Sequence, residues 1–321
     1  MLDVIAIGNA TMDVFVHVHP RVFKGNISFV PGSKVDVEDV DFFTGGGASN
    51  VSVGLARLGL KAGVVAMLGN DPSSRVIVDE FRKEGVSTRL LGFSKKNRTA
   101  YSVILTGFGR DRVVLTYKGS TQELAAGLPV KLGRLRSKWI YVSSFHSSGE
   151  SLKKIFAHAK KNNAKIAFNP GSLELRQGME KFRKLADGID VLLMNASEAL
   201  SLTGSTDIER NLHVLSRIAK IVVITDGAHG VHATDGLDIY SKKPFPVDVL
   251  DTTGAGDAFN AGFVAALVHG KTIEDAIDWG MANSNSVIQY LGIKNILLTQ
   301  QGMKKFLSKF HGNKTVKKNM F

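Results

Sequence analysis

Short apolar runs alternate with basic, helix-prone segments along the second half of the chain. The runs lie at 139–142, 166–168, 191–194 and 221–225. Each run has the pattern of a buried strand, and a helical segment connects it to the next one. The alternation predicts an α/β fold with a mostly parallel sheet, in which ligands bind at the carboxyl ends of the strands.

The N-terminal third contains two more apolar runs that predict buried strands. One covers 4–7, and the other covers 64–69 and precedes a helix near 73–83. Residues 1–10 predict a strand rather than a signal peptide, because they lack a basic start and a long apolar stretch.

Other segments predict strands of a second kind, which lie between the apolar runs. They lie at 14–18, 35–38, 99–106 and 112–117. Residues 107–111 join the last two of these segments, which predicts a hairpin. His17 and His19 share one face, as a pair of metal ligands would. No third ligand is visible, so we interpret both as ordinary strand residues.

The composition provides material for a large core. The chain has 321 residues, 44% hydrophobic and 22% charged, which suits one large domain or a domain with an appendage. No apolar run reaches the roughly 18 residues of a membrane span, so we expect no membrane partner. The absence of cysteine excludes disulfides and thiolate metal sites and is compatible with a reducing cytoplasm, the location that we expect.

The net charge is +12, and part of it is concentrated near the C-terminal end. The lysines there are Lys304, Lys305, Lys309, Lys314, Lys317 and Lys318. A basic tail is one pattern of nucleic-acid binding, but no aromatic–basic interleaving or nucleic-acid motif supports that partner. We interpret the tail as a solvated helix with a frayed end. A basic surface would also attract anionic substrates.

The segment from Asp251 to Asp257, D-T-T-G-A-G-D, leads from an extended segment into an apolar helix. The first amides of a helix have no internal partner, and the small residues Gly254, Ala255 and Gly256 would let an anion approach them. Asp257 beside that anion suits a base that takes a proton from a hydroxyl as it attacks a phosphoryl group. The alternative is an ordinary helix capped by Asp or Thr.

A second group of glycines, Gly45 to Gly47, precedes a helix that Gly59 ends. Glycine lets the backbone approach a ligand, and Asn50 in this helix offers both a donor and an acceptor. Asp13, just past the first strand, would accept hydrogen bonds from paired hydroxyls. The alternatives are a flexible turn before an ordinary helix, and a surface carboxylate.

Polar residues follow the predicted strands of the second half. Asn195 and Glu198 are three residues apart and share one helix face, so their oxygens suit Mg²⁺ bound through water. Alternatively, they form a helix N-cap and its capping box. Arg98 either stays at the surface, which we favour, or binds an anionic substituent of the substrate.

The segment at 251–263, D-T-T-G-A-G-D-A-F-N-A-G-F, resembles the second signature of the PfkB (ribokinase-like) family of carbohydrate and nucleoside kinases. The segment at 45–59 resembles the first signature, and the resemblance extends over nearly the whole chain. It implies a ribokinase-like α/β core with a mostly parallel central sheet flanked by helices, plus a small β-sheet lid. The core would comprise 1–13, 44–96 and 119–321, and the discontinuous lid 14–43 and 97–118.

The resemblance implies ATP-dependent phosphorylation of a sugar hydroxyl, with Asp257 as the general base. The amides of Gly254, Ala255 and Gly256 would stabilise the transferring phosphoryl group. The acceptor would contact Asp13, Gly45, Gly46 and Asn50, together with Arg98 if the substrate is a sugar phosphate.

The resemblance also implies a nucleotide site and metal sites. The residues expected at the nucleotide are Asn195, Thr225, Gly227, Gly230 and, in a helix predicted at 281–289, Asn283. Mg²⁺ is expected at Asn195 and Glu198. Some members bind a monovalent cation such as K⁺, which would lie at Asp251 and Thr253 near Gly292. Asp226 departs from the family pattern, because this position is frequently apolar.

Other functions stay open at this point. A nucleoside kinase of the same fold would stack a base on Phe15, Tyr101 or Phe108, and a phosphosugar kinase would use the same chemistry. A non-catalytic sugar sensor belongs to a different class, and the retention of Asp257 with its glycines argues against it. A lid edge could also pair strands across a homodimer.

Overall fold

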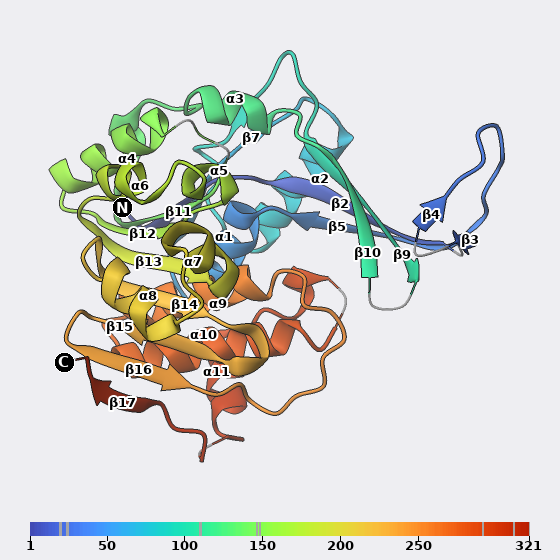
Figure 1. Cartoon of the computed structure of the whole chain (residues 1–321). Coiled ribbons are helices and arrows are strands. Elements are labelled where there is room, and N and C mark those ends of the chain that lie inside the picture. Colours follow the sequence, from blue (N-terminus) through green and yellow to red (C-terminus); the bar gives the residue numbers. More distant parts are fainter. Residues whose placement is uncertain are drawn as a thin grey trace.

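A computed structural model describes the protein at residues 1–18, 21–23, 26–108, 111–145, 147, 149–290, 292–310 and 312–320. Figure 1 shows a large sheet between two layers of helices, and a smaller sheet that projects from one side of this body. The alternation of strands and helices in the sequence therefore predicted the architecture of the main body correctly.

The large sheet has the strand order β17-β16-β15-β14-β13-β12-β11-β1-β6. Its strands are β1 (Leu2–Ile7), β6 (Ala62–Val65), β11 (Ser137–Ser143), β12 (Lys165–Asn169), β13 (Ile189–Asn195), β14 (Ala219–Thr225), β15 (Val231–Thr234), β16 (Asp238–Lys242) and β17 (Val316–Asn319). Neighbouring strands from β6 to β14 are parallel, and those from β14 to β17 are antiparallel. The parallel strands bring their carboxyl ends to one edge, where ligands bind in such sheets.

Helices cover both faces of this sheet because its strands are apolar on both sides. In β1, Val4 and Ala6 pack into one core, and Ile5 and Ile7 pack into the other. The first core contains α1 (Gly47–Arg57), α2 (Pro72–Lys83), α9 (Ala255–Val268), α10 (Ile273–Val287) and α11 (Gln300–Leu307). The second contains α3 (Thr121–Ala126), α4 (Glu150–Lys161), α5 (Ser172–Leu175), α6 (Met179–Leu185), α7 (Ala196–Thr203) and α8 (Ile208–Leu215). The 3-10 turns are η1 (Leu132–Arg134), η2 (Gly227–His229) and η3 (Ile293–Ile296).

The smaller sheet has the strand order β10-β9-β2-β5. Its strands are β2 (Thr11–Val18), β5 (Val37–Gly45), β9 (Ala100–Phe108) and β10 (Asp111–Tyr117). Strands β9 and β10 form the predicted antiparallel hairpin. Two further sheets have two short strands each. One pairs β3 (Arg21–Phe23) with β4 (Asn26–Ser28), and the other pairs β7 (Met67–Leu68) with β8 (Gly92–Phe93). The division of the chain into a core and a lid domain stays a prediction.

The C-terminal tail differs from the prediction. Its first part is the expected helix α11, but Val316–Asn319 is a strand that pairs with β16 at the edge of the large sheet. Lys317 pairs with Asp238 at 2.8 Å, and Lys318 pairs with Glu209 at 2.5 Å. The prediction of a frayed end was wrong, because backbone groups of a sheet edge order this segment and no pattern in the tail reveals that edge.

Several smaller differences concern the boundaries of elements. Asp13 lies inside β2, and the run at 64–69 is divided between β6 and β7. The helix expected at 281–289 begins earlier, at Ile273. His17 contacts Glu38 at 3.1 Å, whereas His19 lies outside the described residues. Within the described ranges, no helix has the length and apolar character to cross a membrane.

Candidate active site

The glycine turn between β5 and α1 brings the backbone close to two other segments. A Cβ on Gly45 would lie 1.8 Å from Asp13 Oδ2. Gly46 has a φ of 93°, and a Cβ on it would lie 2.5 Å from the carbonyl oxygen of Asn9. Glycine is therefore required at Gly45 by close approach, and at Gly46 by close approach and backbone conformation.

The two signature segments meet at a hydrogen bond between α1 and α9. Asn50 Nδ2 donates to Asp257 Oδ2 at 2.8 Å, although 207 positions separate the two residues. Asn50 is 2% exposed, and its Oδ1 has no partner among the described residues. Buried acceptors are normally paired, so this oxygen is suited to accept a hydrogen bond from a ligand hydroxyl.

Helix α9 begins without a side-chain cap. Gly254 is the N-cap, with a φ of 76°, and no side chain caps the helix there. The Ala255 amide donates to the Thr252 carbonyl at 3.2 Å, whereas a Cβ on Gly256 would meet no atom within 4 Å. The alternative of a helix capped by Asp or Thr therefore does not form, and the amide end of α9 is open to an anion.

A cavity of about 190 Å³, called here the smaller cavity, lies beside these segments. It is lined by Asp13, Phe15, Phe43, Thr44, Ser102, Ile104, Arg112, Val114, Asp251, Thr253 and Gly292. Thr11 Oγ1 donates to Asp13 Oδ1 at 3.1 Å, and the rings of Phe15 and Phe43 meet edge to face at 5.5 Å. A carboxylate and hydroxyls between apolar walls are the composition of a site for a small polar ligand.

Burial and neighbouring charges set the acidity of the carboxylates. Burial raises the pKa of Asp257, while the hydrogen bond from Asn50 and the charge of Lys294 lower it. Burial also raises the pKa of Asp13, against a hydrogen bond from Ser102 that lowers it. A carboxylate whose pKa is raised is a stronger base when it is ionised, which suits proton abstraction.

Asn195 and Glu198 form a capping box at the start of α7. Asn195 Oδ1 accepts from the Glu198 amide at 2.8 Å, and Glu198 Oε2 accepts from the Asn195 amide at 2.9 Å. The helix N-cap and capping box, which the sequence offered as the alternative to a Mg²⁺ site, are therefore present. Burial raises the pKa of Glu198, and the negative charge of Asp257 raises it further. Within the described ranges, no group of three or more His, Cys, Asp or Glu could hold a metal ion.

Three residues expected at the nucleotide lie at or after the end of β14. Thr225 is the last residue of β14 and the register partner of Asn195 in β13. Gly227 follows in η2 and is exposed. Gly230 is buried, and a Cβ on it would lie 2.1 Å from the carbonyl oxygen of Lys242. Thr225 and Gly227 therefore lie at the carboxyl end of β14, whereas Gly230 shapes the turn into β15.

Asn283 lies apart from this group. It is fully buried in α10, its Nδ2 donates to the Ala258 carbonyl at 2.7 Å, and its Oδ1 accepts from the Leu298 amide at 2.9 Å. Both polar atoms of this side chain are used inside the protein, where they join α10 to α9. This position argues against the contact with adenine that the resemblance implied.

The structure places two arginines differently with respect to the smaller cavity. Arg98 is exposed and does not line the smaller cavity. Arg112, which was not predicted, lines it and donates from Nη1 to Asp251 Oδ1 at 3.3 Å. The Thr253 hydroxyl also donates to Asp251 Oδ1, at 2.8 Å. The period of two in a strand would have placed Arg112 and Val114 on one face of β10.

Two more polar residues next to the glycine turn were not predicted. Asn9 Oδ1 and Ser143 Oγ are buried and have no partner among the described residues. A Cβ on Gly47 would lie 2.8 Å from Ser143 Oγ and 3.5 Å from Asp257 Oδ1, so these groups surround one point of the glycine turn. Ser143 directly follows the apolar run at 139–142, which is the available signal in the sequence.

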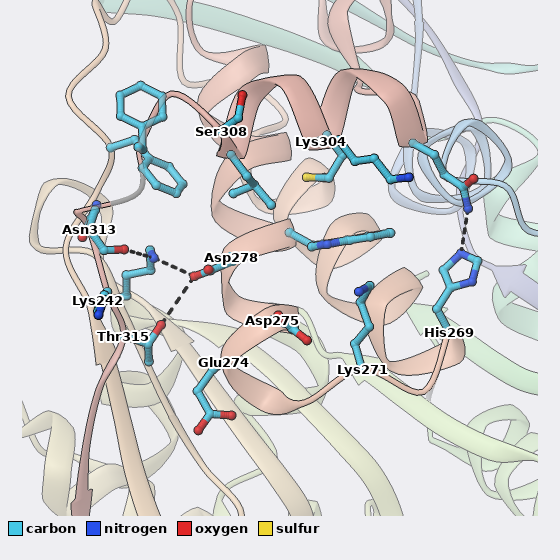
Figure 2. Close-up of a pocket in the computed structure, with 17 residues that line it drawn as sticks. Lys242, His269, Lys271, Glu274, Asp275, Asp278, Lys304, Ser308, Asn313 and Thr315 are labelled. Atoms are coloured by element: carbon cyan, nitrogen blue, oxygen red, sulfur yellow. Dashed lines mark hydrogen bonds and ion pairs between the residues drawn. The ribbon is translucent and has the colours of Figure 1, made fainter.

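A larger cavity of about 800 Å³ lies among α10, α11 and the segment before β17. Figure 2 shows Lys242, Asp278 and Thr315 at one side of it, and Lys271 and His269 at the other. Its lining also includes Trp279, whose ring lies 5.3 Å from Lys271 Nζ. None of the site residues expected from the sequence lines this cavity.

Comparison with known proteins places this geometry in a family. The profile of the pfkB family of carbohydrate kinases matches residues 1–300. The chain is 26% identical over 287 residues to the ribokinase of Haemophilus influenzae, which covers 86% of this chain and 91% of that protein. It is 27% identical over 305 residues to the 5-dehydro-2-deoxygluconokinase of Bacillus subtilis, with coverage of 89% and 90%.

Solved structures share the fold. The ribokinase of Arabidopsis thaliana, complexed with ribose and ATP, has a TM-score of 0.80 at 19% identity, with 95% of this chain and 98% of that chain covered. The nucleoside kinase of Methanocaldococcus jannaschii has a TM-score of 0.77 at 22% identity, with coverage of 96% and 99%. These likenesses confirm the predicted ribokinase-like fold. With a family profile that matches all but the last residues, the chain belongs to the pfkB family of carbohydrate kinases.

Proposed function

We propose that this kinase transfers the γ-phosphoryl group of ATP to a hydroxyl of a small sugar, with Asp257 as the general base. The observation that carries the proposal is the position of the Asp257 carboxylate. It lies in the first turn of α9, beside the open amide end of that helix, and accepts a hydrogen bond from Asn50. A base, an anion-binding helix end and an orienting amide thus come together.

The chemistry follows from this arrangement. Asp257 takes the proton of the acceptor hydroxyl as its oxygen forms a bond to the γ-phosphorus, and the bond to the β-phosphate oxygen breaks to leave ADP. The amides at the start of α9, with Gly256 most open, stabilise the negative charge of the transferring group. Gly254 and Ala255 shape this end, and Ala255 already shares its amide with Thr252.

The acceptor sugar is held on the other side of Asp257. Asp13 accepts hydrogen bonds from its hydroxyls, and the turn at Gly45 and Gly46 lets the ligand approach the backbone. Asn50 Oδ1 and Ser143 Oγ supply further unpaired polar atoms at this point. The smaller sheet covers the site and excludes water, which limits the hydrolysis of ATP.

We place the nucleotide at the ends of β13 and β14, near Thr225 and Gly227. The ribokinase that was solved with ribose and ATP has the same fold and supports ATP as the donor. Mg²⁺ fits here because Asn195 and Glu198 offer hard oxygen donors, and it would neutralise phosphate charge when bound. Because the two side chains cap α7 through Asn195 Oδ1 and Glu198 Oε2, they would hold the ion through water or through Glu198 Oε1.

Asp251 and Thr253 fit a monovalent cation poorly. Asp251 Oδ1 accepts from the Thr253 amide at 3.0 Å and from the Thr253 hydroxyl at 2.8 Å. The Arg112 guanidinium, 3.3 Å away, supplies the positive charge that a K⁺ ion would bring. The mechanism therefore uses no step that depends on K⁺.

A nucleoside kinase is the second candidate. The edge-to-face pair of Phe15 and Phe43 gives the smaller cavity an aromatic wall against which a base could pack, and a nucleoside kinase shares the fold. The side chain of Phe108 lies outside the described residues. The sugar assignment is preferred because the ribokinase and the 5-dehydro-2-deoxygluconokinase are the more similar relatives in sequence.

We also propose that the smaller sheet joins two copies of the chain. Its edge strands β5 and β10 carry exposed apolar side chains. These include Val40, Phe42, Val114 and Leu115. Sedimentation velocity of the full chain at micromolar concentration tests this, and a monomer would contradict it.

An assay of ADP release tests the proposed function. The purified protein is incubated with ATP and Mg²⁺ and one acceptor from a panel that contains ribose, fructose, a deoxy-keto-gluconate, fructose 6-phosphate, adenosine and inosine. A strong response to one sugar is expected. A response to nucleosides alone would support the second candidate, and ATP binding without any response would support a sensor.

A further inference from the structure

Lys294 is a buried cation that no step of the proposed reaction uses. It lies in η3 and is 5% exposed. Its Nζ donates to Thr44 Oγ1, Ser49 Oγ and Glu80 Oε2, each at 2.6 Å. An ammonium group has three protons, so every donor of this side chain is committed to a protein partner.

Two of these partners directly precede residues that we propose to contact the acceptor sugar. Thr44 precedes Gly45 at the end of β5, and Ser49 precedes Asn50 in α1. Glu80, in α2, pairs with the ammonium and also accepts a hydrogen bond from Thr44. A single cation therefore holds both ends of the glycine turn against the body of the protein.

The charges around Lys294 connect it to the reacting carboxylates. Burial lowers the pKa of Lys294, and Glu80, Asp13 and Glu84 raise it. In the other direction, the charge of Lys294 lowers the pKa of Asp257 and that of Asp13. The ammonium is thus balanced mainly by Glu80, and its field reaches both carboxylates of the site.

Other groups also face Asp257 and contribute to its ionisation. Asn50 donates a hydrogen bond that lowers the pKa of Asp257, and the charge of Asp13 raises it. Glu198, from α7, and the phenol of Tyr141, from β11, are titratable groups of the described residues that also interact with Asp257. The charge of Lys294 favours the ionised form of Asp257, whereas the charge of Asp13 opposes it.

We propose that Lys294 is a positioning residue of the phosphoryl transfer. Through Thr44 and Ser49 it fixes Gly45 and Asn50, which orient the acceptor and the base, and its charge keeps the Asp257 carboxylate ready to accept a proton. This inference rests on the proposed function, because it concerns the same base and the same acceptor site.

The test is the pH dependence of kcat in the variant Lys294→Met. Without the nearby positive charge the pKa of Asp257 rises, so the acid limb of the kcat profile moves to higher pH. The loss in kcat is then larger on the acid limb of the profile than on its plateau at higher pH, where the base is ionised in both proteins. Misplacement of Gly45 and Asn50 raises the KM for the acceptor by roughly tenfold.

Lys242→Met is the matched control. Lys242 is equally buried, and its Nζ pairs with Asp278 at 2.6 Å and donates to the Asn313 carbonyl. It lies in the wall of the larger cavity, so its loss breaks a comparable ion pair away from Asp257. Its acid limb and its KM should match those of the unsubstituted protein.

A second variant protects the test against misfolding. Lys294→Met combined with Glu80→Leu removes both members of the ion pair, which buried sites tolerate better than the loss of one partner. This double variant should show the same shift of the acid limb. A uniform loss of kcat at every pH in both variants, or an equal shift in Lys242→Met, would overturn the inference.

The same experiment separates this inference from the proposed function. If the unsubstituted protein is active and Asp257→Asn is not, an unmoved acid limb in the Lys294 variants refutes the role of Lys294 alone. If the unsubstituted protein phosphorylates no acceptor, or Asp257→Asn keeps full activity, the proposed function fails and the role of Lys294 fails with it.

Discussion

Two of the cavities among the described residues, the smaller cavity beside the glycine turn and the larger cavity beside α10 and α11, differ in size and in the way that their polar groups are paired. The larger cavity, about 800 Å³, has an aromatic wall at Trp279, and its buried Lys242 is matched by Asp278. The smaller cavity, about 190 Å³, lies beside a turn where Asn50 and Ser143 each keep a buried polar atom without a partner among the described residues.

The comparison teaches that polar groups left without partners mark the site better than volume does. An unpaired buried acceptor costs free energy unless a ligand satisfies it, whereas a roomy groove between helices costs little. Raised pKa values point the same way, because Asp13 lines the smaller cavity and Asp257 lies near enough for the charge of Asp13 to raise its pKa. The predictions below test this ranking of the two cavities.

The largest effect is expected from Asp257→Asn. The amide keeps the hydrogen-bonding shape but cannot take a proton, so kcat should fall by roughly 100-fold or more while nucleotide binding persists. Steady-state kinetics and a binding titration with ATP measure the two quantities. Because burial raises the pKa of Asp257, the unsubstituted enzyme should also lose kcat on the acid side at a higher pH than an ordinary Asp carboxyl would cause. A kcat close to normal would show that Asp257 is not the base and that the reaction does not take place beside the smaller cavity.

An intermediate effect is expected from Arg112→Ala. The substitution removes a charged donor from the wall of the smaller cavity and releases Asp251, so the KM for the sugar should rise by roughly tenfold. Arg98→Ala is the matched control, because Arg98 is exposed and lies outside the lining. Its KM should stay within about twofold of the original value. Equal KM changes in the two variants would show that Arg112 has no special place at the site.

The smallest kinetic effect is expected from Trp279→Ala in the larger cavity. Removal of a half-buried ring should lower the free energy of unfolding by roughly 2 kcal/mol. At a temperature where the variant is folded, kcat and KM should change by less than about twofold. Chemical denaturation and steady-state kinetics give the two values. A tenfold loss of kcat/KM would show that the larger cavity takes part in function and would break the comparison.

The main elements of the fold could be predicted from the sequence because apolar residues recur in short runs or at regular spacing along its strands and helices. The runs at 139–142 and 221–225 became β11 and β14, and the two glycine-rich segments became the starts of α1 and α9. The antiparallel strands β15, β16 and β17 were missed, since each has only four or five residues. Strand β17 lies at the edge of the sheet and is ordered by its neighbour β16, which the short segment itself does not reveal.

The candidate site was predicted in part, and the roles of its residues stay predictions. Asp13, Asn50 and Asp257, named from the two signatures, lie close together in the structure. Asn283 was placed at the nucleotide by resemblance, yet it is buried between helices, whereas Arg98 is exposed, in line with the surface position that the sequence favoured. A residue type at a family position does not reveal whether its side chain points to the ligand or into the core.

By itself the sequence determined the α/β architecture, the family and the chemical character of Asp257, because periodicity and short motifs are local properties of the chain. Only the tertiary structure decided that Asn50 bonds Asp257 across 207 positions and that Lys294 holds Thr44 and Ser49. These contacts depend on how the helices pack and on which buried polar and charged groups become hydrogen-bond or ion-pair partners. Such distances exist only after the chain has folded.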